Sequence, residues 1–280
     1  MEIRWHPALA RYSTGHLALN WCGEDRPIDT IYLAVLVSVF VAAAIVLVLL
    51  LWIDAPYGKH GRSGWGPSIN PRLFWFLMEL PAFAAFGISY LLGPHALSLW
   101  PLFFCVLFEG HYFHRAFIYP LTLRPRQDGR EPMVLILMAM TFNLANGYLN
   151  GTYLSSYAVH LYSTDWFRDP RFSAGLILFV FGVALNKHSD HVLRHLRGPG
   201  ESGYRIPQGG GFRFVSCPNY LGELIQWSGF ALAAWSPAGL AFAIFTAANL
   251  VPRALASHRW YIARFPDYPA ARKAILPGLL

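Results

Sequence analysis

One segment constrains the fold of this chain more than any other: residues 31–53 run for 23 positions without a charged side chain, as IYLAVLVSVFVAAAIVLVLLLWI. A helix needs about 20 mainly apolar residues to cross the hydrocarbon core of a bilayer. The segment is too long for the core of a secretory signal peptide, and no small-residue cleavage site follows it. It therefore predicts a membrane-spanning helix.

Further apolar segments follow the first one. Hydrophobic residues make up 55% of the chain and charged residues 13%, about half the charged fraction of a typical soluble domain. We expect an all-α, polytopic membrane protein with seven transmembrane helices, in which residues 1–27 form an N-terminal extension and residues 28–280 form one membrane domain. The predicted spans are Ile31–Ile53, Leu73–Leu92, Ala96–Tyr119, Pro132–Leu154, Phe172–Asn186, Leu221–Trp235 and Pro237–Val251.

The basic residues orient these spans, because Lys and Arg collect in the cytoplasmic loops of membrane proteins. With seven spans, 17 of the 22 basic residues fall on the side that holds the C-terminus. This distribution predicts an outside N-terminus and a cytosolic C-terminus. The net charge of +7 lies beside the membrane, where contact with anionic lipid accounts for it. Nucleic acid is therefore not an expected partner, and no obligate protein partner is indicated.

The histidines give a weak argument for a metal site. They include two sparse clusters, His111 with His114, and His188 with His191 and His195. Membrane di-iron oxygenases use several dense histidine boxes, and Arg115 beside the first cluster disfavours a bound cation. We expect no metal. The cysteines are interpreted as free thiols: Cys22, Cys105 and Cys217.

A nucleotide would have to be held by side chains. The sequence contains neither a glycine-rich dinucleotide fingerprint after a strand nor a P-loop motif. Arginine binds phosphate through its two-pronged guanidinium, and the basic-side loops offer Arg126, Arg194, Arg197, Arg205 and Arg253.

Glu79 and Tyr112 are predicted to lie at similar depth on consecutive antiparallel helices. Glu79 is seven residues into the second span from Arg72, about 10 Å, and Tyr112 is eight residues before Pro120, about 12 Å. An ionisable residue inside a span is a functional-site hypothesis. A carboxyl withdrawn from water favours its protonated form, so the pair would offer two hydrogen-bond donors. Two such donors can hold a carbonyl oxygen and stabilise the charge of a developing enolate.

Other polar features of the spans have a structural explanation. Asn143, Asn146 and Asn150 are interpreted mainly as residues that make interhelical hydrogen bonds. Pro81 frees the backbone carbonyl of Leu77 from its helical bond, which suits either a pocket or ordinary helix packing.

From about Ala55 onward the chain resembles the membrane steroid 5α-reductases, the 3-oxo-5α-steroid 4-dehydrogenases. The similar stretches are APYGKHGRSGWGPSINPRLFWFLMELPAF, HYFHRAFIYP, NKHSDHVLRHLRGPGESGYRIPQGGGFRFVSCPNYLGE and HRWYIARFPDYPAARKAILP. The resemblance implies NADPH-dependent reduction of the C4–C5 double bond of a 3-oxo-Δ4 steroid. It implies hydride transfer to C5, with Glu79 and Tyr112 polarising the C3 carbonyl and Trp75 as a further substrate contact.

The same resemblance implies a set of cofactor-binding residues. They are Tyr57, Tyr119, Arg126, Asn186, Asp190, Arg197, Tyr204, Asn219, Glu223, Arg253 and Tyr261. Two departures affect this set: Ser257 stands where close relatives have a histidine, and the loop that contains Arg126 is longer than theirs. The implied cofactor site faces the cytosol.

Two other function classes remain open at this point. A membrane methyltransferase that uses S-adenosylmethionine would share the helical plan, and a steroid or lipid carrier would need no polar cytosolic loops. The identity of the cofactor separates the three. The membrane in which the protein resides depends on the source organism: we expect the inner membrane in a bacterium and the endoplasmic reticulum in a eukaryote. The physiological steroid is not set by the sequence, since several steroids share the reacting ketone.

Overall fold

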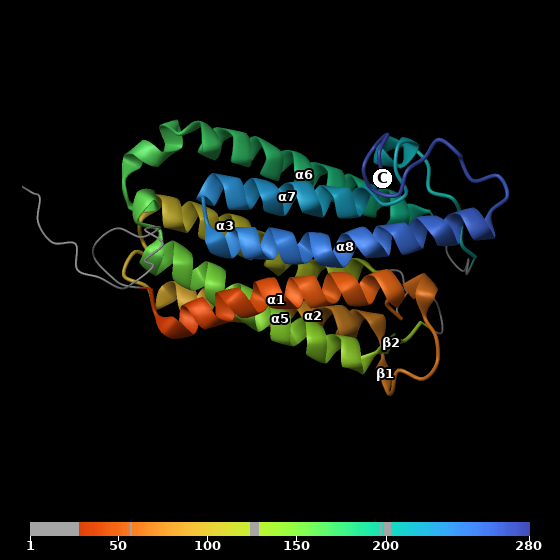
Figure 1. Cartoon of the computed structure of the whole chain (residues 1–280), viewed down its shortest axis with the longest axis horizontal. Helices are drawn as coiled ribbons and strands as arrows, with labels where there is room; N and C mark the ends of the chain where they lie inside the picture. Colours follow the sequence, from red (N-terminus) through yellow and green to blue (C-terminus); the bar gives the residue numbers. More distant parts are fainter. Residues whose placement is uncertain (1–27, 57, 124–128, 197, 199–202) are drawn as a thin grey trace, which may run out of the picture.

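The computed structural model describes residues 28–56, 58–123, 129–196, 198 and 203–280. The chain is mostly helical, and its long helices run side by side along one axis (Figure 1). These helices are α1 (Thr30–Trp52), α2 (Pro71–Leu91), α3 (Leu99–Phe113), α5 (Met133–Thr152), α6 (Pro170–His195), α7 (Pro218–Ala234) and α8 (Pro237–Arg264). The predicted N-terminal extension lies outside the described residues.

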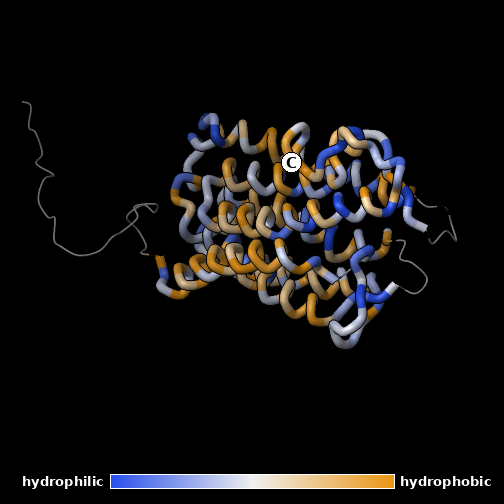
Figure 2. The backbone as a smooth tube through the Cα atoms, turned by 45° about the vertical axis from the view of Figure 1, so that its right-hand side comes forward, coloured by the Kyte–Doolittle hydropathy of each residue, from blue (hydrophilic) through white to orange (hydrophobic). Residues whose placement is uncertain are grey.

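The helices have the apolar character that the sequence predicts. Hydrophobic residues dominate the middle of the helices, and hydrophilic residues gather in the loops at the two ends (Figure 2). Within the described ranges, five helices are long and apolar enough to cross a membrane: α1, α2, α5 with its continuation to Tyr157, α6 and α8. The expectation of a helical integral membrane protein is confirmed. Since α3 and α7 have only 15 and 17 residues, the count of seven spans and their orientation stay predictions.

Two helices extend well beyond the spans that the sequence predicts. The predicted span Phe172–Asn186 continues as helix to His195, and Pro237–Val251 continues to Arg264. The apolar pattern stops where polar residues begin, but backbone hydrogen bonding stops only at a helix breaker or a cap. The extra turns therefore project beyond the apolar part at the basic end of the bundle, and they carry several predicted cofactor residues.

Glycines bring α6 and α7 into close contact. A Cβ atom on Gly182 would lie 2.3 Å from the backbone nitrogen of Gln226, and one on Gly222 would lie 2.5 Å from that of Asn186. Gly175 and Gly229 meet in the same way one heptad away. Small residues allow helix backbones in a membrane to approach closely. This contact sets Asn186 of α6 against the first turns of α7.

A second close pair consists of α2 and α5. A Cβ atom on Gly147 would lie 2.6 Å from the carbonyl oxygen of Ala82, and one on Gly151 would lie 2.6 Å from that of Phe86. Helix α2 continues through Pro81, and the Asn143 amide donates a hydrogen bond of 2.6 Å to the carbonyl of Met78. The sequence predicts that Pro81 frees the carbonyl of Leu77. The carbonyl that accepts from a side chain is that of Met78, one residue later.

Helix α3 does not end as an ordinary helix. It continues through a π-helical turn, His114–Ile118, into the short α4 (Tyr119–Thr122). A π-helical turn holds an extra residue, and such turns are frequent at functional sites. Arg115 lies inside this turn.

Loops and the C-terminal segment close the basic end of the bundle, on the right of Figure 1. A two-residue antiparallel pair joins β1 (Ser68–Ile69) to β2 (Glu131–Pro132). The C-terminal segment lies beside the start of α7, where the Ser216 N–H donates to the Lys273 carbonyl at 2.8 Å and the Cys217 N–H to the Ala274 carbonyl at 3.1 Å. Polar loops and the ends of α6, α7 and α8 therefore meet at one end.

Candidate active site

Arg115 lies between two carboxylates from different helices. Its guanidinium donates to one oxygen of Glu79 on α2, through Nη2 at 2.7 Å and through Nε at 3.1 Å. Its Nη1 lies 3.3 Å from Glu223 on α7. All three side chains are largely buried, so water screens these contacts little. Arg115 thus joins a predicted substrate residue to a predicted cofactor residue.

Two aromatic rings cover the Arg115 guanidinium. Its central carbon lies 4.7 Å from the centre of the Trp75 ring and 5.5 Å from that of Tyr119. Trp75 and Tyr119 also meet edge to face, with ring centres 5.1 Å apart. A guanidinium is attracted to the negative face of an aromatic ring. The structure therefore gathers Trp75, predicted from the substrate side, and Tyr119, predicted from the cofactor side, around one cation.

An arginine from the next helix meets Glu79. The sequence predicts a carboxyl withdrawn from water, with no basic residue near position 79 along the chain. The structure brings Arg115 Nη2 to 2.7 Å from one Glu79 oxygen. That oxygen therefore accepts from the guanidinium, and the role of Glu79 as a hydrogen-bond donor stays a prediction.

Tyr112 lies beside this ion pair, in the aromatic interior of the bundle. Its side chain is buried, and it interacts electrostatically with Glu79, Arg115 and Glu223. Its hydroxyl oxygen accepts a hydrogen bond of 2.9 Å from the amide of Asn146 on α5. Tyr112 and Glu79 are therefore near enough to interact electrostatically, and their roles in a reaction stay predictions.

The histidines of the sequence clusters have separate partners. The Gln226 amide donates to Nδ1 of His111 at 2.8 Å, and Lys187 donates to Nδ1 of His114 at 2.8 Å. On the extra turns of α6 the rings of His191 and His195 meet at a tilt of 34°, with their centres 4.1 Å apart. Across the described ranges, no three residues of the His, Cys, Asp or Glu type are grouped so that they could hold a metal ion.

Several predicted cofactor residues meet where α6 and α7 are in contact. The Asn186 amide donates to the backbone carbonyl of Asn219 at 3.1 Å, and the Asp190 carboxylate interacts with the Asn219 side chain and with Arg115. Glu223 is one turn farther along α7 and contacts the same arginine. Asn186, Asp190, Asn219 and Glu223 therefore form one polar group, which we call the α6–α7 group, and Arg115 links it to Glu79.

A second group lies nearer the end of α8. Lys59 Nζ is 4.1 Å from the centre of the Tyr261 ring and 5.2 Å from that of Trp260, and Trp260 packs against Tyr204 at 4.9 Å. Burial lowers the pKa of Lys59 to about 8. We call these four residues the Lys59 cage. It contains the predicted cofactor residues Tyr204 and Tyr261.

Cys217 connects the cage to the α6–α7 group. Its thiol lies near Lys59 and interacts with the Ser257 hydroxyl, and burial raises the pKa of the thiol to about 11. Asn219 follows two residues later in the chain. Ser257, the residue that departs from the family pattern, is buried against Cys217. The two groups are therefore neighbours along one side of the basic end.

The remaining predicted residues have different outcomes. Arg253 lies on α8, about two turns before Tyr261. Tyr57, Arg126 and Arg197 lie outside the described residues, so their predicted roles stay untested.

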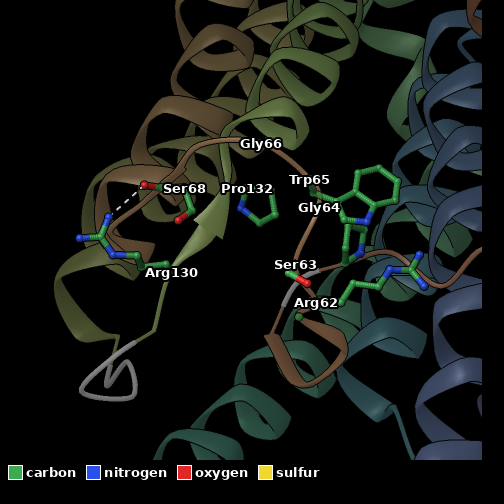
Figure 3. A pocket seen from close by; sticks show the side chains of 10 residues that line it. Arg62, Ser63, Gly64, Trp65, Gly66, Ser68, Arg130 and Pro132 are labelled. Atoms are coloured by element: carbon green, nitrogen blue, oxygen red, sulfur yellow. Dashed lines mark hydrogen bonds between the residues drawn. The ribbon is translucent and has the colours of Figure 1, made fainter.

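An open cleft elsewhere at this end contains none of the predicted site residues. It has a volume of about 210 Å³ and lies between the loop that holds Arg62 and Trp65 and the segment that holds Arg130 (Figure 3). Arg130 is engaged there with the carbonyl of Ser68 at 3.1 Å. Since Glu79 and Tyr112 are not in its lining, we do not assign the reaction to this cleft.

Two important residues are missing from the sequence-based site. In the sequence Arg115 is considered only as a charge that disfavours a metal, although it lies three residues after Tyr112, a spacing that puts both on one face of a helix. Lys59 is only one of the basic residues counted for the orientation, and no sequence pattern reveals that Tyr261 would cover it. Both assignments depend on contacts between distant segments.

Comparisons with known proteins identify the family of the chain. A family model described as 3-oxo-5-alpha-steroid 4-dehydrogenase matches residues 130–280. Steroid 5-alpha-reductase DET2 of Arabidopsis thaliana is 42% identical over 259 residues, which cover 91% of this chain and 98% of that protein. The 3-oxo-5-alpha-steroid 4-dehydrogenase 2 of Homo sapiens is 46% identical over 239 residues, 82% of this chain and 90% of that protein. For 3-oxo-5-alpha-steroid 4-dehydrogenase 1 of Bos taurus, the identity is 44% over 242 residues, 83% and 91% of the two chains. The resemblance seen in the motifs is confirmed, and the chain belongs to the 3-oxo-5α-steroid 4-dehydrogenase, or steroid 5α-reductase, family of enzymes.

Proposed function

We propose that the chain reduces the C4–C5 double bond of 3-oxo-Δ4 steroids with NADPH and gives 5α-steroids. The observation that carries the proposal is the buried cluster in which Tyr112 lies beside the Glu79–Arg115 ion pair. Reduction of an enone places negative charge on its carbonyl oxygen, and fixed donors and charges at that oxygen lower the barrier. Family membership supplies the substrate class, and the cluster supplies groups suited to it.

Glu79 and Tyr112 have different roles in this proposal. Tyr112 donates its proton in a hydrogen bond to the C3 oxygen. Glu79 acts through the ion pair: it holds the Arg115 guanidinium, whose positive charge stabilises the developing enolate. Trp75 covers the guanidinium on one face and offers an apolar surface to the steroid rings.

The residues present fit a nicotinamide cofactor. Asn186, Asp190 and Asn219 offer amide and carboxylate groups that match a carboxamide and a ribose, and Glu223 fixes Arg115 beside them. When bound, NADPH supplies the hydride that the family resemblance assigns to C5, and C4 takes a proton.

The phosphates have matching cations in the same region. Among the described residues, Arg194 and Arg272 each keep a buried Nε atom without a hydrogen-bond partner. Lys59 holds its ammonium over Tyr261. We assign the adenosine phosphates to the Lys59 cage end. Tyr57, Arg126, Arg197 and Arg253 remain part of the proposed cofactor set through the resemblance.

The alternative, a methyltransferase, is not favoured. S-adenosylmethionine carries a sulfonium cation, and the site already concentrates cations at Arg115, Lys187 and Arg194. The relatives reported above are all named as steroid reductases or dehydrogenases.

The same residues support an orientation in the membrane. The basic side of the predicted topology carries the Lys59 cage and the ends of α6 and α8. We propose that this end faces the cytosol, where Lys and Arg accumulate, and that the steroid reaches Tyr112 from the lipid.

The test uses the full chain, purified in detergent, with testosterone and NADPH. Steroid-dependent loss of the nicotinamide absorbance, with the 5α-dihydro product identified by mass spectrometry against both 5-epimers, is the expected result. A steroid with a 3-hydroxyl in place of the 3-ketone is the matched control and should give no oxidation. No oxidation with a range of 3-oxo-Δ4 steroids, from protein that is folded, would refute the proposal. Binding of S-adenosylmethionine by the same preparation would then favour the methyltransferase.

A further inference from the structure

Three buried polar side chains form a chain of hydrogen bonds that ends at Tyr112. The Asn150 amide donates to the Asn146 side-chain oxygen at 2.9 Å, and the Asn146 amide donates to the Tyr112 hydroxyl at 2.9 Å. Tyr112 is 3% exposed, Asn146 2% and Asn150 1%. Water therefore cannot replace these bonds, and each donor and acceptor depends on the others.

A backbone carbonyl fixes the direction of the whole chain. The Asn150 amide also donates to the backbone carbonyl of Asn146 at 3.1 Å. A carbonyl can only accept, so the Asn150 side chain must present its NH₂ group and not its oxygen. The Asn146 oxygen must then face that NH₂ group, which leaves the Asn146 NH₂ group facing Tyr112. If the Asn150 amide were reversed, its oxygen would face two other acceptors. If the Asn146 amide were reversed, its NH₂ group would face the NH₂ group of Asn150.

This direction determines what the Tyr112 hydroxyl does. Because its oxygen accepts from Asn146, its proton must point elsewhere. Asn146 is its one hydrogen-bond partner among the described residues, and Glu79 and Arg115 are its charged neighbours. We infer that Asn146 and Asn150 are positioning residues: they force Tyr112 to accept on one side and so present its proton to the substrate carbonyl. This inference rests on the proposed function, in which Tyr112 is the donor.

The sequence alone favours a simpler role for these asparagines, as interhelical contacts. Asn143 has that role, since its amide donates to the Met78 carbonyl of α2. Asn143 has the same residue type, the same helix and similar burial, 5% against 2% for Asn146, but it does not contact Tyr112. It is therefore a matched control.

The test changes the direction of the bond to Tyr112. In Asn146→Asp the side chain keeps its shape. When the new carboxyl is neutral, it can still donate a hydrogen bond to the Tyr112 oxygen. When it is ionised, it can only accept, so the Tyr112 O–H donates to it and no longer to the substrate. We expect kcat of Asn146→Asp, relative to wild type and per folded molecule, to fall about 100-fold as the pH rises and the introduced carboxyl ionises, similar to the loss of one transition-state donor. The charged neighbours of Tyr112 are the same in both proteins: Glu79, Arg115 and Glu223. Dividing the variant kcat by the wild-type kcat at each pH therefore cancels the effect of their titration.

Three comparisons make the result decisive. Asn143→Asp should show a ratio to wild type that does not change with pH. In the Tyr112→Phe background, Asn146→Asp should add no pH-dependent loss of kcat, because no phenolic O–H remains to be redirected. Asn150→Leu removes the hydrogen bond that orients the Asn146 amide. It should lower kcat several-fold with little change in the KM for NADPH.

The outcomes separate this inference from the function on which it rests. An inactive wild-type protein would refute the proposed function and this inference with it. An active wild type with a ratio for Asn146→Asp that does not change with pH, or an equal effect in the Tyr112→Phe background, would refute the inference alone. If Asn146→Asp does not fold, Asn150→Leu decides: wild-type kcat in that variant would overturn the positioning role.

Discussion

Replacing Arg115 by methionine removes the guanidinium that joins Glu79 to Glu223 and keeps a side chain of similar length. The side chains of Arg115 and Glu79 are 14% and 7% exposed, so the pair belongs with buried ion pairs and not with surface pairs worth about 0–1 kcal/mol. Removing one partner of a buried pair costs about 3–5 kcal/mol, because a buried charge is left uncompensated. Two carboxylates would be left here, so we expect Arg115→Met to lie in the upper half of that range.

The second perturbation shows where this cost arises. Glu79→Gln keeps an oxygen that can accept from Arg115 but removes the charge, and should cost about 1.5–3 kcal/mol, the value of a hydrogen bond to a charged group. In the double variant neither charge of this pair remains. We expect it to be no less stable than Arg115→Met alone, which corresponds to a coupling energy of about 2 kcal/mol. Glu223 still lacks its partner, so full recovery is not expected.

The measurement is unfolding in mixed detergent, followed by the fluorescence of the ten tryptophans. The four proteins of the cycle are compared under one condition, and Arg168→Met, which removes an exposed arginine paired with Asp165, serves as the control with an expected cost below about 1 kcal/mol. If the effects of Arg115→Met and Glu79→Gln add within about 0.5 kcal/mol, the two side chains do not interact. The assignment of Arg115 to the site would then be wrong.

The remaining predictions concern catalysis, cofactor binding and packing. Tyr112→Phe removes the donor to the carbonyl and should lower kcat about 100-fold; an unchanged kcat/KM in steady-state assays would exclude that role. Burial lowers the pKa of Lys59 to about 8, so its ammonium is charged below that pH and the KM for NADPH should rise as pH increases above it. Lys59→Arg should keep that KM constant to higher pH, since a guanidinium stays charged; parallel profiles for the two proteins would show that Lys59 does not meet the cofactor. Gly222→Ala places a Cβ atom 2.5 Å from the Asn186 nitrogen and should cost about 1–3 kcal/mol and weaken NADPH binding. Gly110→Ala, with open space around its Cβ, is the control, and equal effects on unfolding would contradict the proposed close contact.

Much of the helical plan could be predicted from the sequence, because apolar length directly reflects the thickness of a bilayer. The ends of α6 and α8 could not, because hydropathy reports where the lipid ends and not where the helix ends. Glycines spaced seven apart on α6 and on α7, Gly175 with Gly182 and Gly222 with Gly229, are visible in the sequence. Their partners become apparent only when the two helices are placed together.

The candidate site shows a similar division. The depth of Glu79 and Tyr112 follows from counting residues along two antiparallel helices, and the structure places both in one cluster. The contact of Glu79 with Arg115 could not be obtained in this way, because Arg115 comes from another helix. The asparagines show the same limit: residue type alone cannot distinguish Asn143, which binds a backbone carbonyl, from Asn146, which binds a phenol.

The π-helical turn His114–Ile118 makes the site depend on how the helix is wound as well as on residue type. Such a turn fits one extra residue into nearly the rotation of an α-helical turn, so Tyr119 keeps its register with the helix before it. If the same residues formed an ordinary α-helix, every later side chain would be rotated by about 100° around the axis. Tyr119 would then leave Trp75 and Arg115, although the sequence was unchanged. Relatives can therefore be compared by counting residues across this turn: one with a residue fewer needs no π-helical turn to keep the aromatic rings around the arginine.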